Sequence, residues 1–144
     1  MLAALQDAEA VFLVVGAHAM AVHGVPRATG DLDIWVQPDP ENARKVLRAL
    51  AEFGAPLTNL REDDLVDPET VYQIGLPPRR IDIITGIDGV TFEEAWQSRV
   101  ISQIADLPVP FLGWDSLLRN KKASGRLKDL ADVELLEKKK SRKP

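Results

Sequence analysis

Cysteine is absent from this chain of 144 residues. Disulfide bonds, zinc sites with cysteine ligands and thiol catalysis are therefore excluded. Long apolar runs are missing too. The longest stretch without Asp, Glu, Lys or Arg begins at Ala10, contains two histidines and two glycines, and is shorter than the ~18 apolar residues that a spanning helix needs. With no basic leader ahead of Asp7 and no cysteine, we expect a cytoplasmic protein without a membrane partner.

A broad basic surface is also lacking. The formal net charge is −4, yet five of the 18 basic residues lie in the last seven positions, which contain no acid. The rest of the chain then carries 13 basic and 22 acidic residues. An acidic body suits cation binding better than a general nucleic-acid face. The basic tail is read as a solvated helix end with a favourable charge, and contact with nucleic acid is the alternative.

Length and composition describe one domain. A content of 45% hydrophobic and 28% charged residues is typical of a globular protein, and 144 residues suffice for one core. We expect a single domain over 1–144, with a sheet core that carries the catalytic carboxylates at 1–112 and C-terminal helices with a basic tail at 113–144.

Hydrophobic patterning predicts a small mixed sheet flanked by helices, in the α+β or α/β class. Asp39 before Pro40 is typical of a helix start, and Thr91 with Glu94 has capping-box spacing. Pro108 and Pro110 favour a strand at the sheet edge. We expect strands at 11–15, 31–36, 71–76, 80–85, 100–104 and 109–112, and helices at 2–9, 17–23, 40–53, 60–65, 91–97, 115–123 and 127–140.

Asp31 and Asp33 are the most informative pair of residues. Alternate residues of a strand share a face, so both carboxylates point the same way. Neighbouring carboxylates repel each other and resist burial unless a cation lies between them. The alternative is that Asp31 caps a turn after Gly30 and that Asp33 lies on an exposed strand face.

Asp82 is a third candidate carboxylate, flanked by Ile81 and Ile83. If its strand lies beside that of Asp31 and Asp33, the three carboxylates converge. Oxygen ligands on rigid strands suit Mg²⁺, with Mn²⁺ as a possible substitute. Two such ions, about 3.5–4 Å apart, could hold both sides of a phosphoryl displacement.

The Gly16-Ala17 step lies between a predicted strand and a predicted helix. Glycine allows close approach to a ligand, and free N–H groups at a helix start can bind an anion. Phosphates of a nucleoside triphosphate could bind there while Asp31 and Asp33 hold the metal. The sequence has neither a Walker A motif nor a Gly-rich dinucleotide fingerprint.

These features resemble the nucleotidyltransferase superfamily of the DNA polymerase beta type. That family has a Gly-Gly or Gly-Ser step, a spacer of about this length, an Asp-x-Asp strand and a third Asp on a later strand. Here the matching residues are Gly16-Ala17, Asp31-Leu32-Asp33 and Asp82. The segment Leu117 to Asp132 is similar to the C-terminal signature of small bacterial nucleotidyltransferase-like proteins. The resemblance covers about residues 11–136.

The resemblance implies a role for each matching residue. Asp31, Asp33 and Asp82 would be the catalytic metal ligands, and Asp82 could help to deprotonate an acceptor hydroxyl. The remaining matches would bind the phosphates of the nucleotide: Gly16, Ala17, Arg27, Thr29, Lys121 and Lys128.

The implied activity is transfer of a nucleotidyl group from a nucleoside triphosphate to a hydroxyl of RNA or protein, with two Mg²⁺ ions and release of pyrophosphate. Some relatives are toxins of toxin–antitoxin pairs, so a toxin role is implied as well. A chain of this size leaves room for a partner protein or a homodimer. Ala17 stands where the superfamily often has Ser, which favours the alternative of an inactive nucleotide-binding or antitoxin-like protein.

Structural explanations are open for several charged residues. Arg27 could pair with Asp31 or Asp33 instead of binding phosphate. Asp129 and Asp132 are best explained as acids that stabilise a helix start. His18 and His23 are five residues apart, so on a helix they cannot easily share an ion, and a core or loop role is expected for both.

Overall fold

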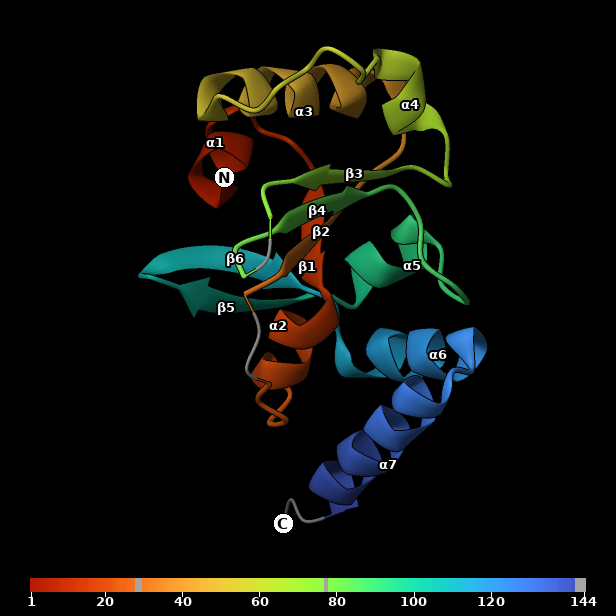
Figure 1. Cartoon of the computed structure of the whole chain (residues 1–144). Helices are drawn as coiled ribbons and strands as arrows, with labels where there is room; N and C mark the ends of the chain where they lie inside the picture. The colour runs from red at the N-terminus through yellow and green to blue at the C-terminus, as the bar shows by residue number, and fades with distance from the viewer. Residues whose placement is uncertain (28–29, 77, 142–144) are drawn as a thin grey trace.

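The computed structural model describes residues 1–27, 30–76 and 78–141, and Figure 1 shows how they are arranged. The helices are α1 (Leu2–Asp7), α2 (Gly16–Val22), α3 (Pro40–Phe53), α4 (Glu62–Val66), α5 (Phe92–Gln97), α6 (Trp114–Ser124) and α7 (Leu127–Ser141). The strands are β1 (Phe12–Val15), β2 (Leu32–Val36), β3 (Val71–Ile74), β4 (Ile81–Ile84), β5 (Val100–Ile104) and β6 (Leu107–Phe111).

One mixed sheet organises the domain. Its strand order is β3-β4-β2-β1-β6-β5. The pairs β2–β4 and β1–β6 are parallel, whereas β1–β2, β3–β4 and β5–β6 are antiparallel. In Figure 1, α3 and α4 lie at one end of the view and α6 and α7 at the other, with the sheet between them. The predicted α+β class is confirmed.

The core is built around β1. Its sequence Phe-Leu-Val-Val is buried along its whole length, as a continuous apolar run in a central strand requires. Helix α3 packs its apolar residues, among them Val46 and Leu50, into the same core. The predicted cap at Asp39 is present, because its side chain accepts a hydrogen bond from the Asn42 N–H at 2.7 Å. The capping box of Thr91 and Glu94 is present too.

Strand β6 contradicts one expectation, because it is not an edge strand. It lies between β1 and β5, and β5 forms the edge. Pairing in register between β1 and β6 is confined to Val14 and Phe111. Pro108 and Pro110 lie outside this short parallel ladder, so their missing N–H groups remove no bond to β1.

A two-residue turn joins β5 to β6, which pair in register up to Ile104 and Leu107. Ala105 and Asp106 both have positive φ, at 49° and 68°. Positive φ at both central positions is typical of a type I′ hairpin, for which Asn-Gly is the usual sequence. Because Ala-Asp lacks that signal, the sequence placed the start of the last strand two residues too late, at Val109.

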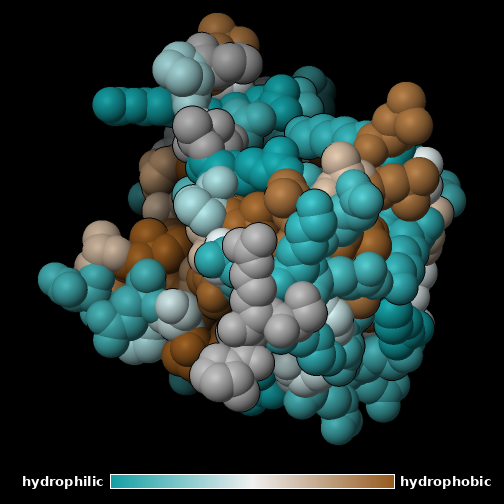
Figure 2. Space-filling view, turned by 90° about the horizontal axis from the view of Figure 1, so that it is seen from below, coloured by the Kyte–Doolittle hydropathy of each residue, from teal (hydrophilic) through white to brown (hydrophobic). Residues whose placement is uncertain are grey.

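Among the described residues, no helix is long and apolar enough to cross a membrane. Seen from below, the surface is mainly hydrophilic, and its hydrophobic side chains occur in small separate groups (Figure 2).

Asn42 joins α3 to the sheet. Its amide oxygen accepts from the Val11 N–H at 2.7 Å, and its amide nitrogen donates to the carbonyls of Val11 and Gln37, each at 2.9 Å. The side chain is 3% exposed. One buried amide therefore satisfies backbone groups beside the start of β1 and the end of β2.

Replacing Asn42 by Ala will leave the Val11 N–H without its partner and will remove one of the two hydrogen bonds that each carbonyl accepts, since Gln37 N–H also donates to the Val11 carbonyl and Asp39 N–H to the Gln37 carbonyl, both at 3.1 Å. We expect Asn42→Ala to lower the free energy of unfolding by about 2 kcal/mol or more. Exposed Glu52 on the same helix provides the control, and Glu52→Ala should change stability by less than about 0.5 kcal/mol. Urea denaturation followed by circular dichroism measures both, and equal effects would contradict this role of Asn42.

Candidate active site

The parallel pairing of β2 with β4 brings the candidate carboxylates together. Asp33 lies opposite Asp82 in the register, and Leu32 lies opposite Ile81. Residues paired in this way point to the same face of the sheet, and Asp31 precedes Asp33 by two residues. The three carboxylates therefore lie close together, although Asp82 is about fifty residues from Asp31 and Asp33 in the chain.

Arg80 lies among these carboxylates. Its Nη2 atom is 3.2 Å from Oδ2 of Asp31, and its Nε atom is 3.1 Å from Oδ1 of Asp82. The second pair is within ion-pair distance but not in hydrogen-bonding geometry, since both buried atoms lack a hydrogen-bond partner. The guanidinium of Arg80 therefore forms ion pairs with two of the three acids. Oδ1 of Asp82 is buried and has no hydrogen-bond partner among the described residues.

The charged form of Asp33 is disfavoured at this position. Burial raises its pKa to about 6, with further contributions from the charge of Asp82, a hydrogen bond with Asp82 and the charge of Asp31, while Arg80 opposes the rise. Crowded carboxylates with too little positive charge are what a divalent cation would relieve.

The donor chemistry fits Mg²⁺, because the site offers carboxylate oxygens and an unsatisfied buried oxygen on Asp82. The described residues nevertheless contain no group of three His, Asp or Glu side chains arranged to hold a metal ion. In this structure Arg80 contacts both Asp31 and Asp82 instead.

Gly16 is where Asp33 meets the start of α2. Its φ is +68°, and a Cβ atom added there would lie 2.2 Å from Oδ2 of Asp33. Only glycine accepts both this backbone conformation and this contact. The predicted helix consequently starts at Gly16, one residue before the sequence placed it.

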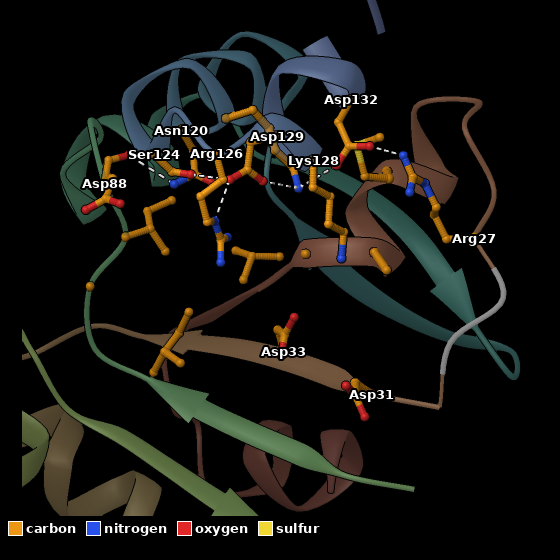
Figure 3. A pocket seen from close by; sticks show the side chains of 18 residues that line it. Arg27, Asp31, Asp33, Asp88, Asn120, Ser124, Arg126, Lys128, Asp129 and Asp132 are labelled. Carbon is orange, nitrogen blue, oxygen red and sulfur yellow. Dashed lines mark hydrogen bonds and ion pairs between the residues drawn. The ribbon is translucent and has the colours of Figure 1, made fainter. Parts of the chain in front are cut away.

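A cleft of about 500 Å³ lies over the carboxylates (Figure 3). The predicted residues that line it are Gly16, Ala17, Arg27, Asp31, Asp33, Lys121 and Lys128. Asp82 is not part of the lining, since it is 8% exposed and lies beside Asp33. Thr29 lies outside the described residues.

Two buried acids on α7, Asp129 and Asp132, pair with three cations of the cleft, which are Arg27, Lys121 and Arg126. Lys121 lies 3.3 Å from Asp129 and 3.0 Å from Asp132. Asp129 also accepts hydrogen bonds from Ser124 at 2.5 Å and from Arg126 at 2.7 Å. The carboxylate of Asp129 therefore links α7 to α6 and to the segment between the two helices.

Arg27 forms its ion pair with Asp132. This partner differs from Asp31 and Asp33, the two that the sequence suggested. Asp129 lies in the first turn of α7, where an acid at a helix start was expected, and both acids are buried, with Asp129 1% and Asp132 2% exposed. Their spacing of three residues, which places both on one helix face, was the sequence signal for this role.

The structure adds cleft residues that the sequence did not indicate. Asp88, Asn120, Ser124 and Arg126 line the cleft together with Asp129 and Asp132. Of the two histidines considered as ligands, His23 has a structural contact, with Nε2 2.9 Å from the carbonyl oxygen of Leu112.

Neither a protein-family model nor a curated protein sequence matches the chain. Solved structures do match. A protein of Thermotoga maritima described as a nucleotidyltransferase matches with a TM-score of 0.57 at 16% identity, covering 99% of this chain and 89% of its own. The lincosamide antibiotic adenylyltransferase LnuA, with lincomycin bound, gives 0.56 at 12% identity, covering 92% and 89%.

The antibiotic-resistance factor ANT(2″)-Ia, in complex with adenylyl-2″-tobramycin, gives a TM-score of 0.57 at 17% identity, covering 97% of this chain and 88% of its own. At these identities the similarity shows the fold. The chain has the nucleotidyltransferase fold, as the family resemblance of its sequence implied.

Gly16→Ala tests the contact between Gly16 and Asp33. Gly125 is the matched control, because its φ is +67°, almost the same as that of Gly16. The nearest atom to a Cβ added at Gly125, among those of the described residues, lies 3.8 Å away, which is an ordinary contact distance. Gly125→Ala therefore carries the backbone cost alone, roughly 1–2 kcal/mol.

We expect Gly16→Ala to be more destabilising than Gly125→Ala, since it adds a collision with Asp33. Combining it with Asp33→Ala should recover the difference. Thermal unfolding measures all four proteins, and an equal loss for both glycine variants would disprove the close contact.

Asp129 gives a prediction for low pH. Burial alone raises its pKa, but hydrogen bonds from Ser124, Arg126 and Lys121 outweigh burial and lower the pKa to about 2. A lowered pKa contributes stability above the unfolded value of 3.8, and this contribution is lost as the pH falls towards 2.

Asp129→Asn should therefore cost about 2 kcal/mol at pH 7, at 1.36 kcal/mol per pKa unit, and progressively less between pH 4 and pH 2. Exposed Asp106→Asn is the control. Urea denaturation at several pH values measures the difference, and a deficit independent of pH would assign the loss to packing instead.

Proposed function

We propose that the protein is a metal-dependent nucleotidyltransferase, which transfers a nucleotidyl group from a nucleoside triphosphate to an acceptor hydroxyl. The observation that carries the proposal is the register of β2 with β4, which sets Asp33 beside Asp82. Asp33 also lies directly against Gly16, the glycine that opens α2. The cleft above them adds four cations, Arg27, Lys121, Arg126 and Lys128.

Asp31, Asp33 and Asp82 would hold two Mg²⁺ ions, with Mn²⁺ as a substitute. The ions would supply positive charge for the α-phosphate and lower the pKa of the acceptor hydroxyl. Because Arg80 contacts Asp31 and Asp82, metal ions held by these carboxylates would take the place of its guanidinium. Each Mg²⁺ ion would supply two positive charges to the three acids, in place of the single charge of the Arg80 guanidinium.

The protein groups bind and orient the triphosphate. Gly16 and Ala17 present backbone N–H groups, and Lys121 and Lys128 reach the phosphates as point charges. The acceptor oxygen attacks the α-phosphorus, the bond between that phosphorus and the bridging oxygen breaks, and pyrophosphate leaves. The hydroxyl proton passes to the carboxylate set, in which Asp82 is the base that the family resemblance implies.

Several acceptor classes are compatible with this chemistry. The sequence resemblance implies RNA or protein and a role as the toxin of a toxin–antitoxin pair. Two similar structures contain small antibiotics, lincomycin in one and adenylylated tobramycin in the other.

A second candidate is an inactive nucleotide-binding or antitoxin-like partner protein of the same fold. Ala17 favours it, since alanine offers phosphate a backbone N–H but no hydroxyl. Arg80 favours it too, because its guanidinium already neutralises part of the carboxylate site.

Asp33→Asn tests the proposal. The protein is incubated with Mg²⁺ and each α-labelled triphosphate, in the presence of RNA, protein and small hydroxyl compounds. We expect wild type to form a labelled product and pyrophosphate, and Asp33→Asn to lose at least about 10²-fold of this rate because a metal ligand is removed. Asp106→Asn, in the β5–β6 turn, should retain it.

Calorimetry with triphosphate and Mg²⁺ separates the alternatives. Binding without transfer supports the partner protein, and free phosphate in place of pyrophosphate indicates a phosphohydrolase. The absence of both binding and labelling would refute the enzyme and the binding protein alike.

A further inference from the structure

A second hollow lies next to the cleft, on the same face of the sheet. Its volume is about 580 Å³, and the segment Gly86–Asp88 lines both hollows. Trp35, which lines the second hollow, follows Asp33 by two residues on β2 and lies opposite Ile84 of β4. Its side chain therefore projects from the same sheet face as the carboxylates.

The wall between the hollows is held in place from two sides. Asn120 of α6 donates to the Asp88 carbonyl at 3.0 Å, and Arg119 donates to the Gly89 carbonyl at 3.0 Å. On the other side, a Cβ atom added to Gly86 would lie 2.2 Å from the carbonyl oxygen of Pro68. The two hollows are thus adjacent compartments with a fixed partition.

The linings of the two hollows differ in their basic residues. The cleft has Arg27, Lys121, Arg126 and Lys128 beside five acids, whereas none of the described residues that line the second hollow is Lys or Arg. The second hollow has two acids, Glu69 and Asp88, at an otherwise apolar and hydroxyl-bearing wall.

Aromatic side chains form the inner part of the second hollow. Trp35 and Phe92 meet edge to face with ring centroids 4.9 Å apart, and Val90 lies beside them in the lining. Such a wall binds an apolar or aromatic body, and a nearby acid favours a positive group on it. A nucleic-acid acceptor carries phosphates and needs cations, which the described lining does not offer.

The position of the second hollow suits an acceptor. In Figure 3, Arg27 and Asp88 lie on opposite sides of Asp33, with Lys128 nearer to Arg27. Arg126 lies on the Asp88 side in the same view. Pyrophosphate would leave towards Arg27 and Lys128. In-line displacement brings the attacking hydroxyl from the opposite side, which is the side of the Gly86–Asp88 wall and of the second hollow.

We propose that the second hollow is the acceptor pocket, and that the acceptor is a small hydroxyl compound, uncharged or cationic, with an apolar or aromatic body. This inference rests on the proposed function and narrows its acceptor class. The volume lies within the range of about 300–1,000 Å³ of pockets for such molecules.

Val71→Trp fills the acceptor pocket in the test. Val71 lines it from the edge strand β3 and is 60% exposed, so a larger side chain can be accommodated without disturbing the core. Ile101→Trp is the matched control, because Ile101 is 62% exposed on the opposite edge strand β5.

The probes are a panel of drug-sized hydroxyl compounds, half of them amines and half neutral, an RNA oligonucleotide with a free 3′ hydroxyl, and a denatured protein mixture. Each is incubated with α-labelled triphosphates and Mg²⁺, and products are identified by mass spectrometry. Binding of the panel compounds is measured in parallel by ligand-observed NMR.

We expect a panel compound to bind and to become nucleotidylated. Val71→Trp should raise the KM for that compound at least about tenfold, while triphosphate affinity by calorimetry stays unchanged. Ile101→Trp should match wild type in both. Labelling of RNA or protein in place of the panel, or an unchanged KM in Val71→Trp, overturns the acceptor pocket but leaves the proposed function intact.

A panel that neither binds nor becomes labelled, with triphosphate still bound, also overturns the inference. Loss of triphosphate binding in wild type would instead refute the proposed function, and the acceptor pocket with it.

Discussion

The parallel pairing of β2 with β4 is the constraint on which the site depends. It sets Asp33 against Asp82, and through the same register it sets Trp35 against Ile84. The strand pairing at the centre of the sheet therefore brings acids together, and burial, followed by the charge of Asp82, raises the pKa of Asp33 to about 6. Glycine at position 16 follows from the antiparallel pairing of β1 with β2, which sets Val15 opposite Asp33, because any side chain at position 16 would collide with Asp33.

Much of the fold could be predicted from the sequence, because its signals are local. The apolar run of β1, the Asp39 cap and the Thr91–Glu94 capping box each act within a few residues. The failures have a different origin. Ala105 and Asp106 adopt positive φ because the pairing of β5 with β6 requires a tight turn there. Pro108 is tolerated in the interior strand β6 because the pairing of β6 with β1 is short and does not reach it.

The candidate site was predictable to a similar degree. Asp31, Asp33 and Gly16 could be recognised from their spacing in the sequence, because each lies on or directly beside a single strand or turn. Asp129 and Asp132 bury their charge only because Lys121 and Arg27 reach them from other elements, and such distant partners cannot be inferred from position alone. Arg80 lay within reach of the sequence, since it shares a strand face with Asp82.

The shared wall at Gly86–Asp88 has a consequence for how this protein can vary. Any change in the length or path of that segment alters the cleft and the second hollow together. The residues between Glu69 and Val71, by contrast, border the second hollow alone. If the second hollow holds the acceptor, as proposed, new acceptor preferences would arise through the edge strand β3 and the loop before it, while the geometry around the aspartates is preserved.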